Sequence, residues 1–260
     1  MNKRIDFYYF SGTGNTQLIV DHAVNSLTMN GCNVSVKHIE KGYTFSENEP
    51  AEELWFAFPV NSQAVSPFIW RFFRSLPQNS GTKVYVIATL NNSAYILKPL
   101  FTLLKNKGYT PTSACEISMP NNMSDTHQSK ENDLHQLIAA CDRVHQFVSD
   151  SFAGEVNWDS EYKGSSFVSF LSRRTGLPWM SMRLLLKLRT EASQCTGCGL
   201  CVRHCPVQNI SIASHVSVHG NKCEFCMKCA ASCPKKAIYI SGKPKIKIRS
   251  TKMPHSTIQR

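Results

Sequence analysis

Two copies of one cysteine pattern constrain this chain more than any other feature. In each copy, four cysteines have the spacing C-x-x-C-x-x-C-x-x-x-C and a proline follows. Three thiolates at steps of three residues can wrap a tight loop around one cubane cluster, while the fourth cysteine is carried past it. The pattern therefore predicts two [4Fe–4S] clusters. The first copy comprises Cys195, Cys198, Cys201 and Cys205, and the second Cys223, Cys226, Cys229 and Cys233.

Structural zinc and disulfide bonds are the other uses of clustered cysteines, and both fit this pattern poorly. Zinc sites usually combine two separated C-x-x-C knuckles, or cysteine and histidine pairs, around one ion. Disulfides need an oxidising compartment, and the apolar run at the N-terminus breaks into Ser-Gly-Thr-Gly instead of forming a signal core. No stretch approaches the roughly 20 apolar residues of a membrane span. We therefore expect a cytoplasmic protein.

The two cysteine runs also form an internal repeat. Ile210 aligns with Ile238 and Ile212 with Ile240, and these side chains are expected to cover the clusters and exclude water. Residues 191–243 resemble the bacterial two-cluster ferredoxins over their whole length. The resemblance implies a small α+β domain.

The same resemblance implies crossed ligation, because the fourth cysteine of each run binds the other cluster in two-cluster ferredoxins. One cluster then takes Cys195, Cys198, Cys201 and Cys233. The other takes Cys223, Cys226, Cys229 and Cys205.

The first part of the chain alternates between apolar runs and amphipathic stretches. Residues 5–10 form the continuous apolar run of a central parallel strand, whereas residues 15–29 have apolar side chains at helical spacing. Strand–helix alternation of this kind predicts an α/β fold with a doubly wound parallel sheet. The expected strands are residues 5–10, 33–39, 54–58, 84–90 and 109–118, and the expected helices are residues 15–29, 67–76, 95–107 and 131–152.

The first strand runs directly into a loop rich in glycine and hydroxyl groups, and a helix follows. Gly12 and Gly14 allow the backbone to curl tightly, so that its N–H groups and the helix N-terminus face an anion. The loop has no lysine, so it is not a Walker loop, and it lacks the third glycine of a dinucleotide fingerprint. It therefore predicts a phosphate site of another kind, formed by Ser11, Gly12, Thr13, Gly14, Asn15 and Thr16.

This S-G-T-G-N-T loop resembles the FMN phosphate loop of the flavodoxins. The resemblance implies a five-stranded sheet in the order 2-1-3-4-5, with FMN at the switch point beside strands one and three. A capped helix without a ligand is the other interpretation of such a turn. If the resemblance holds, the phosphate is held by Ser11, Thr13, Gly14, Asn15 and Thr16.

Two further loops should contact the flavin ring, because they follow the third and fourth strands at the carboxyl edge of the sheet. Many flavodoxins place an aromatic residue in the first loop, where this chain has Asn61, and glycines in the second, where it has Asn91 and Asn92. The flavin would then be more open on one face. Residues 119–123 could also reach the site or simply connect elements. The candidate ring contacts are Pro59, Val60, Asn61, Ser62, Thr89, Leu90, Asn91 and Asn92.

The chain as a whole resembles the flavodoxin–ferredoxin fusion proteins that are common in anaerobes. Its parts are then a flavodoxin-like FMN-binding domain (1–155), a connecting basic amphipathic segment (156–190), a two-[4Fe–4S] ferredoxin domain (191–243) and a basic mobile tail (244–260). In the connecting segment, Pro178 is expected to break a helix that resumes at Trp179 or soon after. Its apolar side is expected to pack across the domain interface, with a membrane surface as the alternative.

The formal net charge of +11 points to acidic partners. Two clusters and FMN would lower it to about +5, which remains basic. A redox protein of the ferredoxin or flavodoxin type, if acidic, would be attracted. Nucleic acid is not expected, because no nucleic-acid-binding fold is recognisable. Nothing in the sequence indicates the oligomeric state.

A chain that holds both kinds of cofactor suits intracellular electron transfer, because clusters pass one electron and FMN takes one or two. One alternative is an FMN-dependent reductase of a small organic substrate fed by the clusters, which an open flavin face at Asn61 would suit. A second alternative is a binding or sensing module whose flavin site is empty. No NAD(P)H domain is visible, so direct nicotinamide oxidation is not expected.

Overall fold

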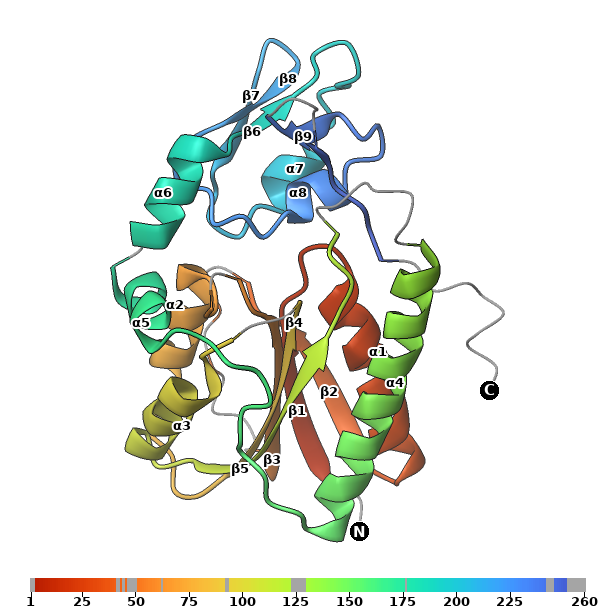
Figure 1. Cartoon of the computed structure of the whole chain (residues 1–260), viewed down its shortest axis with the longest axis vertical. Helices are drawn as coiled ribbons and strands as arrows, with labels where there is room; N and C mark the ends of the chain where they lie inside the picture. Colours follow the sequence, from red (N-terminus) through yellow and green to blue (C-terminus); the bar gives the residue numbers. More distant parts are fainter. Residues whose placement is uncertain are drawn as a thin grey trace.

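The computed structural model describes residues 3–40, 43, 45, 51–61, 63–91, 94–122, 130–175, 177–241 and 246–251. The predicted ring contacts Ser62 and Asn92, together with Met123 and most of the predicted tail, lie outside the described residues. Figure 1 shows a sheet with helices on both sides and a smaller unit seated above one end of it.

The N-terminal unit is built on a five-stranded parallel sheet in the order β2-β1-β3-β4-β5. This order confirms the predicted flavodoxin-like, doubly wound α/β fold. Strand β1 pairs on both sides, so that Phe7 lies opposite Val36 on β2 and Trp55 on β3. The strands are β1 (Arg4–Tyr9), β2 (Asn33–His38), β3 (Glu53–Pro59), β4 (Lys83–Leu90) and β5 (Thr110–Ser118).

Helices cover both faces of the sheet, which is why the central strands are apolar along most of their length. On one face, α1 and α4 pack over a core that contains Trp55 and Phe147. On the other face, α2 and α3 pack over a core that contains Phe56 and Phe73 (Figure 1). All the bounds of this unit lie within two residues of those expected from the sequence. The helices are α1 (Asn15–Met29), α2 (Pro67–Ser75), α3 (Leu97–Asn106) and α4 (Lys130–Ala153).

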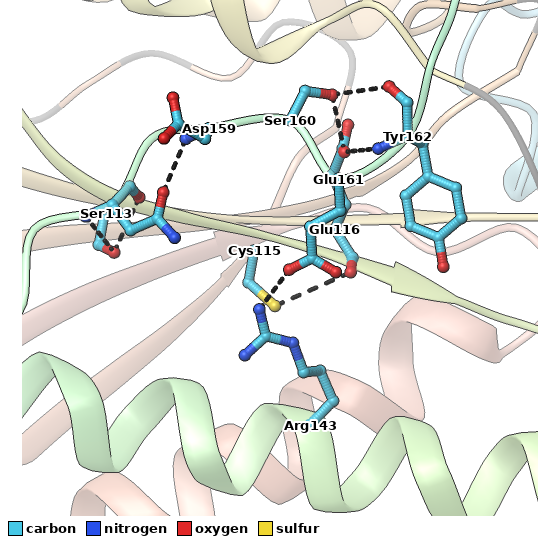
Figure 2. Close-up of polar contacts among 9 residues, drawn as sticks. Ser113, Cys115, Glu116, Arg143, Asp159, Ser160, Glu161 and Tyr162 are labelled. Carbon is cyan, nitrogen blue, oxygen red and sulfur yellow. Dashed lines mark hydrogen bonds and ion pairs between the residues drawn. The ribbon is translucent and has the colours of Figure 1, made fainter.

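Residues 157–162 run beside β5, the outer strand of the sheet (Figure 2). Ser160 Oγ and the Tyr162 N–H both donate to Glu116 Oε2, at 2.8 and 3.1 Å. A backbone N–H of β5 donates to the carbonyl oxygen of Asn157 at 2.7 Å. The exposed edge of the sheet is thus covered, and this first part of the predicted connecting segment packs against the flavodoxin-like unit.

Two short helices lead from the sheet to the C-terminal unit. Pro178 lies in the first turn of the second helix, where proline is tolerated, so this helix begins before Trp179 and earlier than expected. Trp179 is buried in the C-terminal core, whereas Leu184 and Leu185 are 77% and 80% exposed. The apolar side of this helix thus packs in part against the C-terminal unit, and its packing across the domain interface stays a prediction. The helices are α5 (Ser166–Arg174) and α6 (Leu177–Leu185).

The C-terminal unit is the predicted small α+β arrangement, with a three-stranded sheet β10-β9-β6, the hairpin β7-β8 and two one-turn helices. Ile210, Ile238 and Ile240 are buried in its core, whereas Ile212 is 38% exposed and shields less than expected. Across the part of the chain that is described, no helix has the length and apolar character to span a bilayer. The elements are β6 (Leu188–Thr190), α7 (Leu200–Arg203), β7 (Ile210–Ala213), β8 (Val216–His219), α8 (Lys228–Ala231), β9 (Ile238–Ile240) and β10 (Ile246–Lys247).

Replacing Ser160 with alanine should destabilise the flavodoxin-like unit. Glu116 is buried, and its Oε1 has no hydrogen-bond partner among the described residues, so the carboxyl group depends on the two donors to Oε2. We expect the free energy of unfolding to fall by about 1–3 kcal/mol, measured by urea unfolding followed by tryptophan fluorescence. The control is Ser181→Ala at an exposed serine, which should change it by less than about 0.5 kcal/mol. An equal effect of the two substitutions would contradict this account of the edge.

Candidate functional site

The predicted phosphate loop connects β1 to α1 at the carboxyl edge of the sheet. Gly14 is the N-cap of α1 and has a φ of 105°, in the left-handed region that residues with a side chain rarely adopt. Its N–H donates to Ser11 Oγ at 3.2 Å. The buried Thr16 hydroxyl lies 2.7 Å from that of Thr89 at the end of β4. The loop is therefore a tight turn at a helix N-terminus, which is the arrangement that suits an anion.

A cavity of about 410 Å³ opens beside this loop. Its volume falls within the range of roughly 300–1,000 Å³ that is usual for small-molecule sites. The carboxyl ends of parallel strands meet at one edge, so the loops after β1, β3, β4 and β5 all contribute to it. Gly14 shapes the turn without lining the cavity. The predicted contacts that line it are Ser11, Thr13, Asn15, Thr16, Pro59, Val60, Asn61, Thr89, Leu90 and Asn91.

Two polar residues that were not among the predicted contacts form hydrogen bonds to the phosphate loop. Asn122, after β5, donates from Nδ2 to Thr13 Oγ1 at 2.8 Å and to Asn15 Oδ1 at 3.1 Å. Thr251 donates its N–H to the Thr13 carbonyl oxygen at 2.9 Å, and its hydroxyl hydrogen-bonds to Asn15. Asn122 lies in the loop that the sequence left undecided. No sequence pattern indicated Thr251, which the fold brings back from the far end of the chain.

The second cysteine loop forms another wall of the same cavity, through Phe225, Cys226 and Met227. The approach is so close that a Cβ atom on Gly12 would lie 1.7 Å from the Cys226 carbonyl oxygen. A side chain at position 12 would therefore force the two loops apart. Gly12 was predicted to allow close approach of a ligand, and here it also allows close approach of the cysteine loop.

Glu224, in the same cysteine loop, fixes the junction between the two units. Its Oε2 accepts the N–H of Phe68, in the first turn of α2, at 2.8 Å, and its Oε1 pairs with Arg71 at 3.2 Å. Burial raises the pKa of Glu224, while the Phe68 N–H and Arg71 oppose that rise. A carboxylate at a helix N-terminus also interacts favourably with the helix dipole. Beside this junction, Lys228 Nζ lies 5.5 Å from the centre of the Phe10 ring.

The four cysteines assigned to one cluster line a single small cavity. They come from both runs, three from the first and the last from the second, as the crossed ligation requires. Cys198 is exposed, so this cavity reaches the protein surface. Its cysteines are Cys195, Cys198, Cys201 and Cys233.

The cysteines assigned to the other cluster are more deeply buried. Burial raises the pKa of Cys226 to about 12 and that of Cys229 well above the ordinary value, and Cys223 and Cys205 lie near enough to raise both further. Cys205 thus lies with the second run, although it belongs to the first. Within the described residues, no three His, Cys, Asp or Glu side chains gather closely enough for one metal ion, whereas a cubane, being wider, keeps its thiolates farther apart.

Backbone N–H groups point at sulfur atoms of both cysteine sets. Such hydrogen bonds raise the potential of a cluster by stabilising its more reduced, more negative state, and they also orient the ligands. These donor and sulfur pairs include Asn209 to Cys205 at 3.2 Å, Phe225 to Cys223 at 3.4 Å and Ala237 to Cys233 at 3.4 Å. The eight cysteines therefore suit clusters, and their ligand sets remain predictions.

Comparison with known proteins identifies the C-terminal unit. Residues 194–237 match the family described as the 4Fe-4S dicluster domain. A search of curated proteins found no match to the chain.

Several solved structures are similar to the N-terminal unit. A flavodoxin from Streptococcus pneumonia TIGR4 shares 16% identity at a TM-score of 0.42, over 58% of this chain and 99% of its own. The oxidised flavodoxin 1 from Bacillus cereus shares 14% at 0.43, over 58% and 98%. A putative quinone reductase from Klebsiella pneumoniae shares 10% at 0.42, over 59% and 86%. These scores are too low to carry an argument, and the flavodoxin-like assignment rests on the strand order.

The strand order and the family match together define the class of this protein. The chain joins a flavodoxin-like domain to a 4Fe–4S ferredoxin-type domain. This combination indicates an electron-transfer protein that binds 4Fe–4S clusters.

Replacing Glu224 with alanine should loosen the junction between the two units. The Phe68 N–H would lose a charged acceptor, which is worth about 1.5–3 kcal/mol. We expect the exchange of this amide hydrogen to accelerate by about 10-fold or more, measured by hydrogen–deuterium exchange on the full chain. In Arg71→Ala the bond from Phe68 to Glu224 remains, so exchange there should change much less. Equal protection of this amide in Glu224→Ala and in the unaltered protein would contradict the proposed junction.

Proposed function

We propose that this protein is an intracellular electron-transfer iron–sulfur flavoprotein that passes electrons between two [4Fe–4S] clusters and FMN. One observation carries the proposal, namely that the phosphate loop and the second cysteine loop line one cavity, where Gly12 and Cys226 make backbone contact. A flavin in that cavity would adjoin a ligand of the cluster assigned to Cys223, Cys226, Cys229 and Cys205.

The residues around the cavity fit FMN. Ser11, Thr13 and Thr16 would supply hydroxyl groups to the phosphate beside the N-terminus of α1. The loops that contain Asn61 and Asn91 would flank the ring. When bound, FMN exchanges one or two electrons and each cluster exchanges one, so the chain can convert between the two modes.

The burial of the two cysteine sets supports an order for electron transfer. Cys198 is exposed, whereas Cys229 is buried and Cys226 faces the flavin cavity. The cluster with Cys198 as a ligand would therefore exchange electrons with an external protein, and the other cluster would exchange them with the flavin.

Anaerobic purification with analysis of iron, sulfide and flavin tests this proposal. We expect about eight iron atoms and eight sulfides per chain, which is two four-iron clusters, together with one FMN. Stepwise reductive titration should then reduce both kinds of cofactor. Clusters without flavin, in a protein that takes up no added FMN, would favour the binding or sensing module. Flavin reoxidised faster by a small organic substrate than by ferredoxin would favour the reductase.

The proposed partner is an acidic redox protein of the ferredoxin or flavodoxin type. Arg203, Lys235 and Lys236 are exposed beside the cysteine set that reaches the surface at Cys198. Positive charge at this end would attract an acidic protein and orient it toward that set.

Charge reversal at this surface should slow electron entry. In the double variant Lys235→Glu, Lys236→Glu we expect cluster reduction by an acidic ferredoxin to slow by about 10-fold at low salt, measured by anaerobic stopped-flow absorbance. The difference should shrink as salt is added, because exposed charges are screened. The matched control is Arg74→Glu, Arg174→Glu, which makes the same change of charge in a cleft lined by α2 and α5. Equal slowing by both variants would mean that net charge, and not this surface, directs the partner.

A further inference from the structure

The two cysteine loops share an unusual backbone but not the residues that usually form it. In the first copy, Gly197 and Gly199 have φ angles of 67° and 72°. The residues 28 positions later, Phe225 and Met227, have φ angles of 51° and 61°. Glycine adopts this left-handed region without penalty, whereas a Cβ atom makes it unfavourable. The second copy therefore keeps two strained side chains at positions that the first copy fills with glycine.

Strain that persists in a native structure is often found at functional sites. Phe225 and Met227 both line the cavity beside the phosphate loop, on either side of Cys226. The first loop contributes nothing to that cavity, and Gly199 lines the cavity of the other cysteine set instead. The two copies thus differ in their side chains at these positions, and the copy with Phe225 and Met227 is the one that faces the flavodoxin-like domain.

Packing inside the ferredoxin-type domain does explain part of their burial. Phe225 and Met227 are 5% and 3% exposed, and both belong to the core of that domain. The turns themselves do not require these two residues, however, because the first loop makes the same turns with glycine. Their additional property is that they present an aromatic ring and a polarisable thioether to the cavity, and both groups pack well against planar rings.

Among the described residues, the flavodoxin-like side of the cavity contributes one thioether, Met119, and no aromatic ring. Its two ring-flanking loops contribute Asn61 and Asn91 where an aromatic stacking partner could have been. We propose that Phe225 and Met227 form the apolar wall of the flavin site, so that the cluster-binding loop itself contacts the flavin. This inference rests on the proposed function, because it requires that FMN occupies the cavity.

Replacing Met227 with glycine tests whether this side chain contacts the flavin. It also introduces the residue that the first copy has at the matching position. In Met227→Gly, in the full cluster-containing chain, we expect the Kd for FMN to rise by about 10-fold, since an apolar contact of the ligand is lost. Iron content should be unchanged, whereas the thermal midpoint should fall, because the loss of a buried side chain outweighs the relief of the left-handed backbone. Affinity is measured by quenching of FMN fluorescence, and iron by chemical analysis of the same samples.

A second variant and a control separate contact with the flavin from packing of the core. Phe225→Leu retains most of the side-chain volume but removes the aromatic face, and should weaken FMN binding and alter the visible circular dichroism of the bound flavin. Met182→Ala removes another methionine that packs against the same core without lining the cavity, and should leave the FMN Kd unchanged.

The possible outcomes distinguish this inference from the proposed function. If the unaltered protein binds no FMN, the proposed function fails. Suppose instead that the unaltered protein binds FMN and that Met227→Gly keeps its iron. A Kd of this variant within about twofold of the unaltered protein's would then show that Met227 does not contact the flavin, and the inference would be wrong. If Met227→Gly loses its clusters, the test rests on Phe225→Leu. An unchanged FMN affinity and an unchanged visible circular dichroism spectrum in that variant would overturn the proposal. A loss of FMN affinity in Met182→Ala as large as in Met227→Gly would also overturn it.

Discussion

The arrangement of this protein depends on the close approach of two backbones, the phosphate loop and the second cysteine loop. Gly12 leaves space for the Cys226 carbonyl oxygen, and a Cβ atom there would lie only 1.7 Å from it. Glu224 fixes the same junction by accepting the N–H of Phe68 at the start of α2. A change of side-chain rotamer cannot relieve a contact between two backbones. The contact therefore fixes the position of the ferredoxin-type domain relative to the flavodoxin-like domain.

This contact makes one cavity out of two domains. The flavodoxin-like sheet supplies the loops at its carboxyl edge, and the ferredoxin-type domain supplies the segment around Cys226. Of the cysteines assigned to one cluster, Cys226 lines this cavity and Cys229 is buried, whereas the other set opens to solvent at Cys198. Phe225 and Met227 line this cavity from a left-handed backbone, at positions where the first cysteine loop has glycine.

Much of the fold was predictable, because each element carries its own periodic pattern. The continuous apolar runs of β3 and β4 and the helical spacing in α1 located these elements to within two residues. Predictions were less accurate where tertiary contacts determine the start of a helix or the burial of a side chain. Pro178 proved compatible with the first turn of α6, and Ile212 is more exposed than its repeat partner Ile240, because the two copies have different neighbours. Ser160 and Tyr162 hold their segment against the sheet through contacts to Glu116 that no local pattern encodes.

The sequence by itself determined the local chemistry, namely two runs of cysteine with cluster spacing, a hydroxyl-rich loop between a strand and a helix, and the alternation that builds a parallel sheet. Spacing along the chain controls each of these, so they can be read without coordinates. Only the tertiary structure decided which surfaces meet. It brought Cys205 to the second run, Thr251 to the phosphate loop and Phe225 and Met227 to the cavity. Such contacts depend on the shapes of two folded surfaces, and no pattern within a single segment records them.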